Sequence, residues 1–183
     1  VGAIGRSEGE HELVVAHQPL SPVAEGFRKL RTNLEFLGID GQLDSVLVTS
    51  PGPQEGKSLV ATNLAAAAAQ GGRFTILVEG DLRQPAARRL FQRTSKVGLT
   101  NALLEGRLNG KIQQTEVQGL RFLAAGDEPP NPAEMLGSRR MGDVLDSLLE
   151  EADLVVIDSA PVLPVADSLA LARHADGVLL VVD

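Results

Sequence analysis

The stretch at positions 49–58, Thr-Ser-Pro-Gly-Pro-Gln-Glu-Gly-Lys-Ser, carries residue types that bind a polyphosphate. In such a loop, backbone N–H groups and the positive end of a helix dipole hold the phosphate oxygens. Gly56 lets the backbone approach the phosphates, Lys57 reaches the β- and γ-phosphates, and the Ser58 hydroxyl suits Mg²⁺. The usual pattern has glycine five residues before Gly56, where this chain has Pro51. A simple Gly/Pro turn is therefore the alternative interpretation of this stretch.

Three acidic residues follow apolar runs elsewhere in the chain and favour the nucleotide interpretation. Glu79 and Asp81 come after one run, and Asp158 comes after another. A phosphate loop needs such carboxylates, because Mg²⁺ takes hard oxygen ligands opposite the triphosphate. Each acid alone would more often cap a turn or a helix, but three of them beside a Gly-Lys-Ser loop favour one nucleotide site. The predicted nucleotide contacts are Gly52, Pro53, Gln54, Glu55, Gly56, Lys57, Ser58 and Leu59.

The composition narrows the classes of function. With 183 residues, 43% of them hydrophobic, the chain can bury the core of one domain. The net charge of -7 argues against a general nucleic-acid binder. The absence of cysteine excludes disulfides and thiolate metal sites, and no apolar run approaches the ~20 residues of a membrane span. We therefore expect a soluble protein that fits a reducing cytosol.

The apolar pattern predicts the elements that must position these residues. A short uninterrupted apolar run bounded by Gly and charge, as at 74–78, is typical of a buried parallel strand, and we expect further strands at 46–48, 120–124, 154–157 and 178–182. Helices are expected at 22–37, 59–69, 141–149 and 165–173, whereas 85–119 alternates short helical pieces with turns. Strands alternating with helices predict a doubly wound α/β fold with a mostly parallel sheet. Ligands of such sheets bind at the carboxyl ends of the strands, where the three acids fall.

The first long helix marks a boundary in the chain. Residues 1–20 show no sustained period, so we expect a linker or arm, and 21–183 is expected to form the domain. Ser21 suits the cap of the helix and Pro22 its first turn. Glu25, Arg28 and Arg31 lie three residues apart, on an oblique stripe that could contact a neighbouring subunit. A surface ion pair worth about 0.5 kcal/mol is the alternative.

From Ser21 to Asp183 the chain resembles the cytoplasmic kinase domain of bacterial tyrosine kinases that regulate capsular and exopolysaccharide export. The phosphate loop resembles their Walker A motif, residues 78–83 their second, family-specific Walker motif, and residues 154–161 their Walker B motif. The Glu25-x-x-Arg28-x-x-Arg31 stripe is similar to the family's oligomerisation motif. Residues 129–136, Pro-Pro-Asn-Pro-Ala-Glu-Met-Leu, resemble a further characteristic segment.

The resemblance implies ATP- and Mg²⁺-dependent phosphoryl transfer to tyrosine. Lys57 would neutralise developing phosphate charge, while Ser58 and Asp81 would hold Mg²⁺, with Asp158 acting directly or through water. Glu79 matches an aspartate that the family is proposed to use as the base for the tyrosine hydroxyl. Its extra methylene moves the carboxylate outward. This shift could weaken the proton transfer, because donor and acceptor need to lie roughly 2.6–3.2 Å apart.

The resemblance also implies partners: a ring-like homo-oligomer, a membrane activator of the polysaccharide co-polymerase type, and a tyrosine-containing protein substrate. It places the domain at the inner face of the cell membrane. The family phosphorylates a C-terminal tyrosine cluster, but this chain contains no tyrosine, so it cannot phosphorylate itself on tyrosine. Because the family fold continues beyond the position of Asp183, we expect a truncated domain; a protein that has lost autophosphorylation is the alternative.

Two other functions stay open. The first is a switch ATPase of the kind that positions division machinery or partitions plasmids. Those proteins carry a second lysine five residues before Lys57, where this chain has Gly52, and this difference counts against them. The second is a nucleotide-binding scaffold of an export complex with weak or no phosphoryl transfer, which Glu79 and the missing tyrosines favour.

Overall fold

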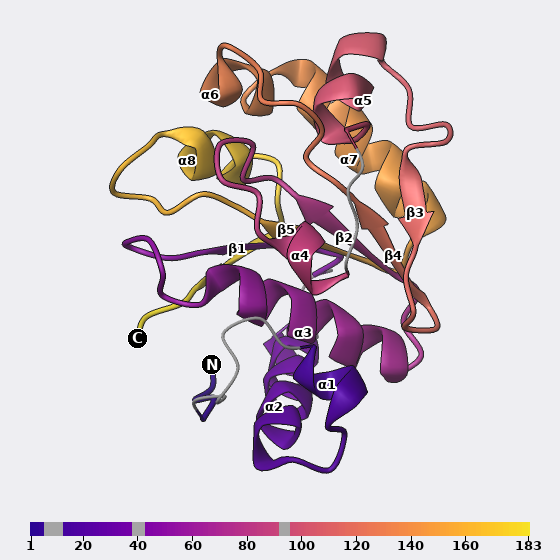
Figure 1. The fold of residues 1–183 in the computed structure, drawn as a ribbon, viewed down its shortest axis with the longest axis vertical. Helices are drawn as coiled ribbons and strands as arrows, with labels where there is room; N and C mark the ends of the chain where they lie inside the picture. The colour runs from indigo at the N-terminus through magenta and orange to yellow at the C-terminus, as the bar shows by residue number, and fades with distance from the viewer. Residues whose placement is uncertain (6–12, 38–42, 92–95) are drawn as a thin grey trace.

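A computed structural model describes residues 1–5, 13–37, 43–91 and 96–183. Within these residues, a six-stranded sheet has the order β3-β4-β2-β5-β1-β6 (Figure 1). Its strands are β1 (Ser45–Thr49), β2 (Thr75–Glu79), β3 (Ile112–Gln114), β4 (Leu120–Leu123), β5 (Leu154–Asp158) and β6 (Gly177–Leu180). The strand pairs are parallel except that β3 runs antiparallel to β4. The predicted doubly wound, mostly parallel sheet is confirmed.

Helices cover both faces of this sheet. They are α1 (Val14–His17), α2 (Pro22–Leu37), α3 (Lys57–Gln70), α4 (Ala87–Leu90), α5 (Leu99–Glu105), α6 (Pro132–Leu136), α7 (Arg139–Glu151) and α8 (Asp167–Ala172). One core cluster joins the sheet to α1, α2, α3 and α4, and a second joins the other face to α5, α6, α7 and α8 (Figure 1). The result is three layers with the sheet in the middle. None of the helices in the described part of the chain is long and apolar enough to cross a bilayer.

The small side chains of α3 explain how this helix packs against the sheet. Residues 65–69 are all alanine and all buried, and α3 contacts β1, β2 and β5. Short side chains let the helix axis approach the strands closely, as the alanine run predicts. The strand that carries the phosphate loop and the helix that follows it are therefore held rigidly together.

One strand differs from the expectation drawn from the sequence, and part of the amino-terminal segment packs against the core. β3 lies within 85–119, where no strand is predicted, because its three residues include a single apolar side chain and pair only with β4. In the amino-terminal segment, Leu13, Val14 and Val15 are buried in the core with α2 and α3. The backbone N–H of Val15 donates to Oδ1 of the buried Asn63 at 3.0 Å. The domain boundary at Ser21 itself stays a prediction.

The helix α2 begins as its sequence predicts. The Ser21 hydroxyl accepts a hydrogen bond from the Ala24 N–H at 3.1 Å, which is the N-cap interaction. Phe27 and Leu30 are buried on the apolar face, while Leu37 at the end is 64% exposed. Gly38, a residue type that suits the end of a helix, follows directly and lies outside the described residues.

Candidate functional site

The loop between β1 and α3 has the backbone of a phosphate-binding turn. Gly56 lies immediately before α3 with a φ of 82°, in the left-handed region. A Cβ at this position would meet nothing within 4 Å, so backbone conformation rather than space favours glycine. Gln54 has a φ of 65°, which is uncommon for a residue other than glycine. The chain thus turns sharply into the amino end of α3, where free N–H groups and the helix dipole favour an anion.

Side chains of the loop hold its shape from within. Glu55 Oε1 accepts a hydrogen bond from the Gly52 N–H at 2.8 Å, and the Ser50 hydroxyl donates to the Gly52 carbonyl at 2.6 Å. The second oxygen of Glu55 is buried and has no hydrogen-bond partner among the described residues. Because Gly52 offers one backbone N–H, a phosphate oxygen that accepts a hydrogen bond from it would displace the Glu55 carboxylate.

Lys57 and Asp81 meet across the strand ends. Lys57 Nζ lies 3.1 Å from Asp81 Oδ2, and the two side chains are 12% and 4% exposed. The other oxygen of Asp81 accepts a hydrogen bond from the Gln84 N–H at 2.9 Å, which fixes the carboxylate within its own loop. Two residues predicted to serve the same site are therefore in contact. Phosphate and metal would each take one partner of this ion pair.

Asp158 is the most unusual carboxylate of the site. It ends β5, between β1 and β2, where its Cα pairs with those of Val48 and Glu79. It is fully buried, and neither of its oxygens has a hydrogen-bond partner of good geometry in the described part of the chain. Burial raises the pKa of Asp158 to about 7, against the opposing effects of the Lys57 charge and the Ser58 hydroxyl. A buried carboxylate without a well-formed hydrogen bond is costly, so the neighbourhood of Asp158 suits a bound cation.

Glu79 lies at the same edge of the sheet but is already engaged. Its side chain is fully buried, and Oε2 accepts a hydrogen bond from the Ala125 N–H at 3.1 Å. Ala125 follows β4, so this bond joins two neighbouring strand ends on the side away from β1. The carboxylate therefore stabilises the backbone in this conformation, and its role as the base stays a prediction.

The oxygen donors at this edge fit a magnesium ion. Ser58, Asp81 and Asp158 offer a hydroxyl and two carboxylates around the start of α3. No group of three or more His, Cys, Asp or Glu side chains forms a metal site among the residues that the structure describes. Mg²⁺ in nucleotide sites uses few protein ligands and keeps water and phosphate oxygens. A small oxygen set beside a phosphate loop therefore suits Mg²⁺ better than a metal held by protein alone.

Two further polar residues beside the site are missing from the predicted set. Arg83 follows Asp81 in the same loop, and it forms a double hydrogen bond with Asp167 of α8. Arg83 stands in the second Walker-like stretch and could have been singled out from it. Asp167 gives no such signal, because an acid at the start of an apolar helix ordinarily acts as a cap.

The three residues of the oligomerisation stripe do not behave alike. Arg28 Nη1 lies 3.0 Å from Glu25 Oε2, and this pair is on the surface. Arg31 turns toward α3, where Nη1 donates to the Ala67 carbonyl at 3.1 Å. A Cβ on Gly71 would stand 2.3 Å from that same nitrogen, so glycine makes room for Arg31. Within one subunit, Arg31 therefore joins two helices while Glu25 and Arg28 remain at the surface.

Known proteins share this architecture and much of the sequence. Tyrosine-protein kinase YwqD of Bacillus subtilis is 38% identical over 177 residues, or 96% of this chain and 75% of that protein. The crystal structure of the chimerical protein CapA2B2 matches with 36% identity and a TM-score of 0.91, over 98% of this chain and 78% of that one.

More distant matches share the architecture alone. The septum site-determining protein MinD of Pyrococcus horikoshii, complexed with Mg-ADP, is 22% identical with a TM-score of 0.64, over 75% of this chain and 56% of that one. At this identity the likeness shows the fold. No protein-family model matches the chain. The extensive match to YwqD, on the same P-loop fold, leads to one conclusion: the chain belongs to the family of bacterial tyrosine-protein kinases.

Proposed function

We propose that this domain binds Mg-ATP at the carboxyl ends of β1, β2 and β5 and transfers the γ-phosphoryl group to tyrosine. The observation that carries the proposal is Asp158, a fully buried carboxylate to which no well-formed hydrogen bond is donated within the described residues, beside the Lys57–Asp81 ion pair. Unsatisfied buried charge is unfavourable unless a ligand compensates it. A divalent cation supplies positive charge to the carboxylates, and a triphosphate supplies negative charge to Lys57.

Each residue of the site then has one role. Lys57 leaves Asp81 and contacts the phosphates, where its charge offsets the negative charge that develops during transfer. Asp81, Asp158 and the Ser58 hydroxyl would hold Mg²⁺, which would supply positive charge against the phosphates during transfer. Backbone N–H groups of residues 52–59 cradle the phosphates, and the amino end of α3 adds its dipole. Glu79 fixes the end of β4 in the free protein, and its role as the base for the tyrosine proton stays a prediction.

The domain acts within a larger assembly in this proposal. Glu25 and Arg28 contact a neighbouring subunit in a ring-like homo-oligomer, because their side chains lie at the surface, where the pair they form with each other is open to a further partner. Arg31 supports this face by fastening α2 to α3. Residues 21–183 are the kinase unit and 1–20 an arm upon it. No nucleic acid is bound, in keeping with the net charge of -7.

The physiological setting follows from the family. A relative described as a putative tyrosine-protein kinase in the cps region of Klebsiella pneumoniae is 30% identical over 171 residues. We place this domain at the inner face of the cell membrane. There a membrane activator of the polysaccharide co-polymerase type engages it, and its phosphorylation of a tyrosine-containing protein regulates capsular or exopolysaccharide export.

The test supplies tyrosine in trans, because the chain has none. The protein is incubated with labelled Mg-ATP and a tyrosine-rich peptide, and phosphotyrosine and free phosphate are recorded separately. We expect phosphotyrosine, and we expect Lys57→Met to lower its rate by about 100-fold or more, since one charge donor to the transition state is lost. Binding of a fluorescent nucleotide is measured in parallel.

The other outcomes separate the two alternative functions. Free phosphate without phosphotyrosine would favour the switch ATPase. Nucleotide binding with neither product, also in the presence of a candidate membrane activator, would favour the scaffold. Absence of nucleotide binding would contradict all three.

A further inference from the structure

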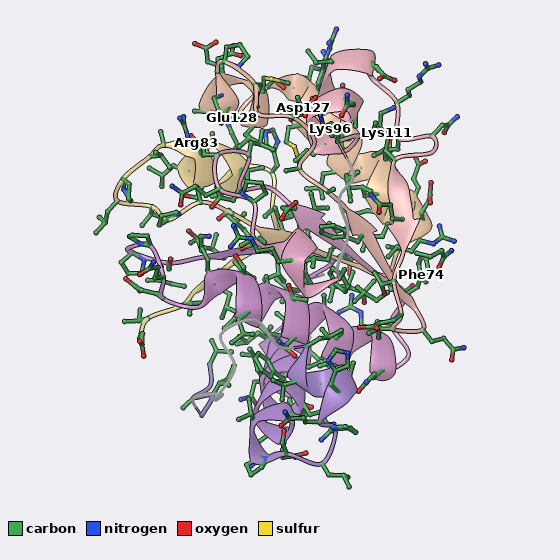
Figure 2. All side chains as sticks on the ribbon, in the orientation of Figure 1. Phe74, Arg83, Lys96, Lys111, Asp127 and Glu128 are labelled. Atoms are coloured by element: carbon green, nitrogen blue, oxygen red, sulfur yellow. The ribbon has the colours of Figure 1, made fainter. Side chains whose placement is uncertain are left out.

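Arg83 and Asp167 form a two-point ion pair next to the proposed metal site. Arg83 Nε lies 2.8 Å from Asp167 Oδ2, and Nη2 lies 3.2 Å from Oδ1. The Asp167 side chain is completely buried, whereas Arg83 is 39% exposed. Figure 2 shows Arg83 beside α8, the helix that Asp167 begins. A planar guanidinium held at two nitrogens restricts orientation as well as distance.

On one side, this pair fastens the loop that presents Asp81. The loop starts at Gly80, whose N–H donates to the Asp158 carbonyl at 2.7 Å. A Cβ on Gly80 would stand 3.0 Å from that oxygen and 3.1 Å from a methyl group of Leu171, so the loop lies directly against β5 and α8. Arg83 is two residues beyond Asp81, and the ion pair therefore limits how far Asp81 can move from Asp158.

On the other side, the pair is connected to the phosphate loop. The segment 159–166 runs from Asp158 to Asp167 and is hydrogen-bonded to the loop before Gly56. The N–H of Val162 donates to the Ser50 carbonyl at 2.8 Å, and the N–H of Leu163 donates to the Pro51 carbonyl at 3.2 Å. Thr49 Oγ1 also donates to the Ala160 carbonyl at 2.8 Å.

These hydrogen bonds and ion pairs connect the segments around the site in a ring. It runs from the phosphate loop through 159–166 to Asp167, across to Arg83 and Asp81, and back through Lys57. The Lys57–Asp81 bridge must open when phosphate and metal bind, according to the proposed function. The proposed function assigns neither Arg83 nor Asp167 a contact with phosphate or metal, so their bridge can persist. It then remains as a side-chain contact that holds the Asp81 loop to α8 while Lys57 leaves.

We propose that Arg83 and Asp167 are positioning residues that keep Asp81 and Asp158 at the spacing required for Mg²⁺ while Lys57 moves to the phosphates. The inference rests on the proposed function. Mutation of a residue that orients a metal ligand commonly lowers the affinity for the metal by about 10–100-fold. The pair therefore supports metal-dependent binding and transfer, and leaves the phosphate loop itself unchanged.

The experiment measures binding of a fluorescent ADP analogue with Mg²⁺ and in EDTA, using the full chain. Asp167→Asn is expected to raise the Mg²⁺ concentration needed for half-maximal effect by about 10-fold. Its affinity for nucleotide in EDTA should stay within about twofold of wild type, because the phosphate loop is intact. In the peptide assay, kcat should fall with an unchanged KM for the peptide.

Arg83→Lys is the second variant, and it guards against loss of folding. It keeps a cation opposite the buried Asp167 but loses the two-point geometry. We expect a Mg²⁺ shift in the same direction and smaller than that of Asp167→Asn. The double variant Arg83→Gln/Asp167→Asn replaces the ion pair with a neutral hydrogen-bonded pair. The Mg²⁺ concentration that it needs for half-maximal effect should lie closer to the wild-type value than that of Asp167→Asn.

Glu105→Gln is the matched control. It removes one charge from the ion pair in which Lys111 Nζ lies 2.8 Å from Glu105 Oε2. The Lys111 side chain is 5% exposed. Figure 2 shows Lys111 and Arg83 on opposite sides of the view, and Lys111 belongs to the β3 end of the fold. This control should leave the Mg²⁺ dependence within about twofold of wild type even if its thermal stability falls.

The outcomes distinguish this inference from the proposed function. If wild type binds the nucleotide and folded Asp167→Asn and Arg83→Lys keep its Mg²⁺ dependence, the pair serves stability alone and the inference is overturned. The same holds if Glu105→Gln shifts the Mg²⁺ dependence as much as Asp167→Asn does. If wild type binds no nucleotide, the proposed function falls first and the inference falls with it.

Discussion

Asp176 and Asp158 lie at opposite ends of the parallel strands and use their carboxylates in opposite ways. At the amino ends, Asp176 Oδ2 accepts hydrogen bonds from the N–H of Asp44 and from both the N–H and the hydroxyl of Ser45, at 2.7–3.1 Å. At the carboxyl ends, Asp158 accepts no well-formed hydrogen bond from the described residues, although it is completely buried. Asp153 resembles Asp176, because it accepts from the Phe74 N–H at 2.8 Å.

The difference separates carboxylates that build the sheet from carboxylates kept for a ligand. An acid that satisfies backbone N–H groups at a strand start stabilises the fold and gains nothing from a cation. An acid buried without donors destabilises the free protein and gains from one. Glu79 makes the comparison more informative, because it lies at the ligand end but binds a backbone N–H as the structural acids do.

The strongest way to test the comparison is Asp158→Asn. The change keeps the shape and removes the buried charge, so we expect phosphotyrosine formation to fall by about 100-fold or more, as for other lost transition-state contacts. The free protein should become more stable at neutral pH, because a buried charge whose desolvation outweighs its interactions with Lys57 and Ser58 is removed. The peptide assay and chemical denaturation measure the two effects. A less stable Asp158→Asn protein would show that Asp158 is structural after all.

The pH dependence of stability tests the same carboxylate without mutation. Burial raises the pKa of Asp158 from 3.8 to about 7, so between these values the folded state holds a proton that the unfolded state has released. Stability should therefore fall as pH rises from about 4 to 7 and level off above 7. Since one pKa unit corresponds to about 1.4 kcal/mol, the loss is on the order of 4 kcal/mol.

The measurement is urea denaturation at several pH values without nucleotide or Mg²⁺. The difference between wild type and Asp158→Asn isolates this group, because other carboxylates titrate in both proteins. We expect the difference to be near zero at pH 4 and to grow toward pH 7. A constant difference over this range would contradict the raised pKa.

Asp176→Ala tests the other end of the sheet. It leaves two backbone N–H groups and one hydroxyl without their acceptor, so we expect a loss of about 1–3 kcal/mol in the free energy of unfolding. The affinity for Mg²⁺ and nucleotide should not change, since the strands separate this end from the site. If nucleotide affinity fell as much as stability did, the two ends would not be separable.

Glu79→Gln is expected to have the smallest effect, and it decides which class Glu79 belongs to. A glutamine oxygen can still accept the Ala125 N–H, so phosphotyrosine formation should stay within about tenfold of wild type. General base catalysis contributes about 100-fold or more, and a loss of that size would assign the proton transfer to Glu79. Glu79→Ala is the companion variant, which should lose stability because the Ala125 N–H then has no acceptor.

Much of the fold could be predicted because its signals are local. The runs at 74–78 and 154–157 coincide closely with β2 and β5, since strands buried on both faces are apolar along their whole length. β3 could not be predicted, because Ile112–Gln114 is a strand only through its pairing with β4. The burial of Leu13, Val14 and Val15 also depends on partners far along the chain, including Asn63.

The site divides in the same way. The sequence by itself determined that Lys57, Asp81 and Asp158 converge, because the carboxyl ends of neighbouring parallel strands meet at one edge of a sheet. Only the tertiary structure decided which carboxylates are satisfied, that Glu79 turns to Ala125, and that Arg83 pairs with Asp167 84 positions away. The local sequence pattern places a side chain at the end of a strand. Which partner that side chain contacts depends on which loops meet there in space and on the direction in which the side chain points.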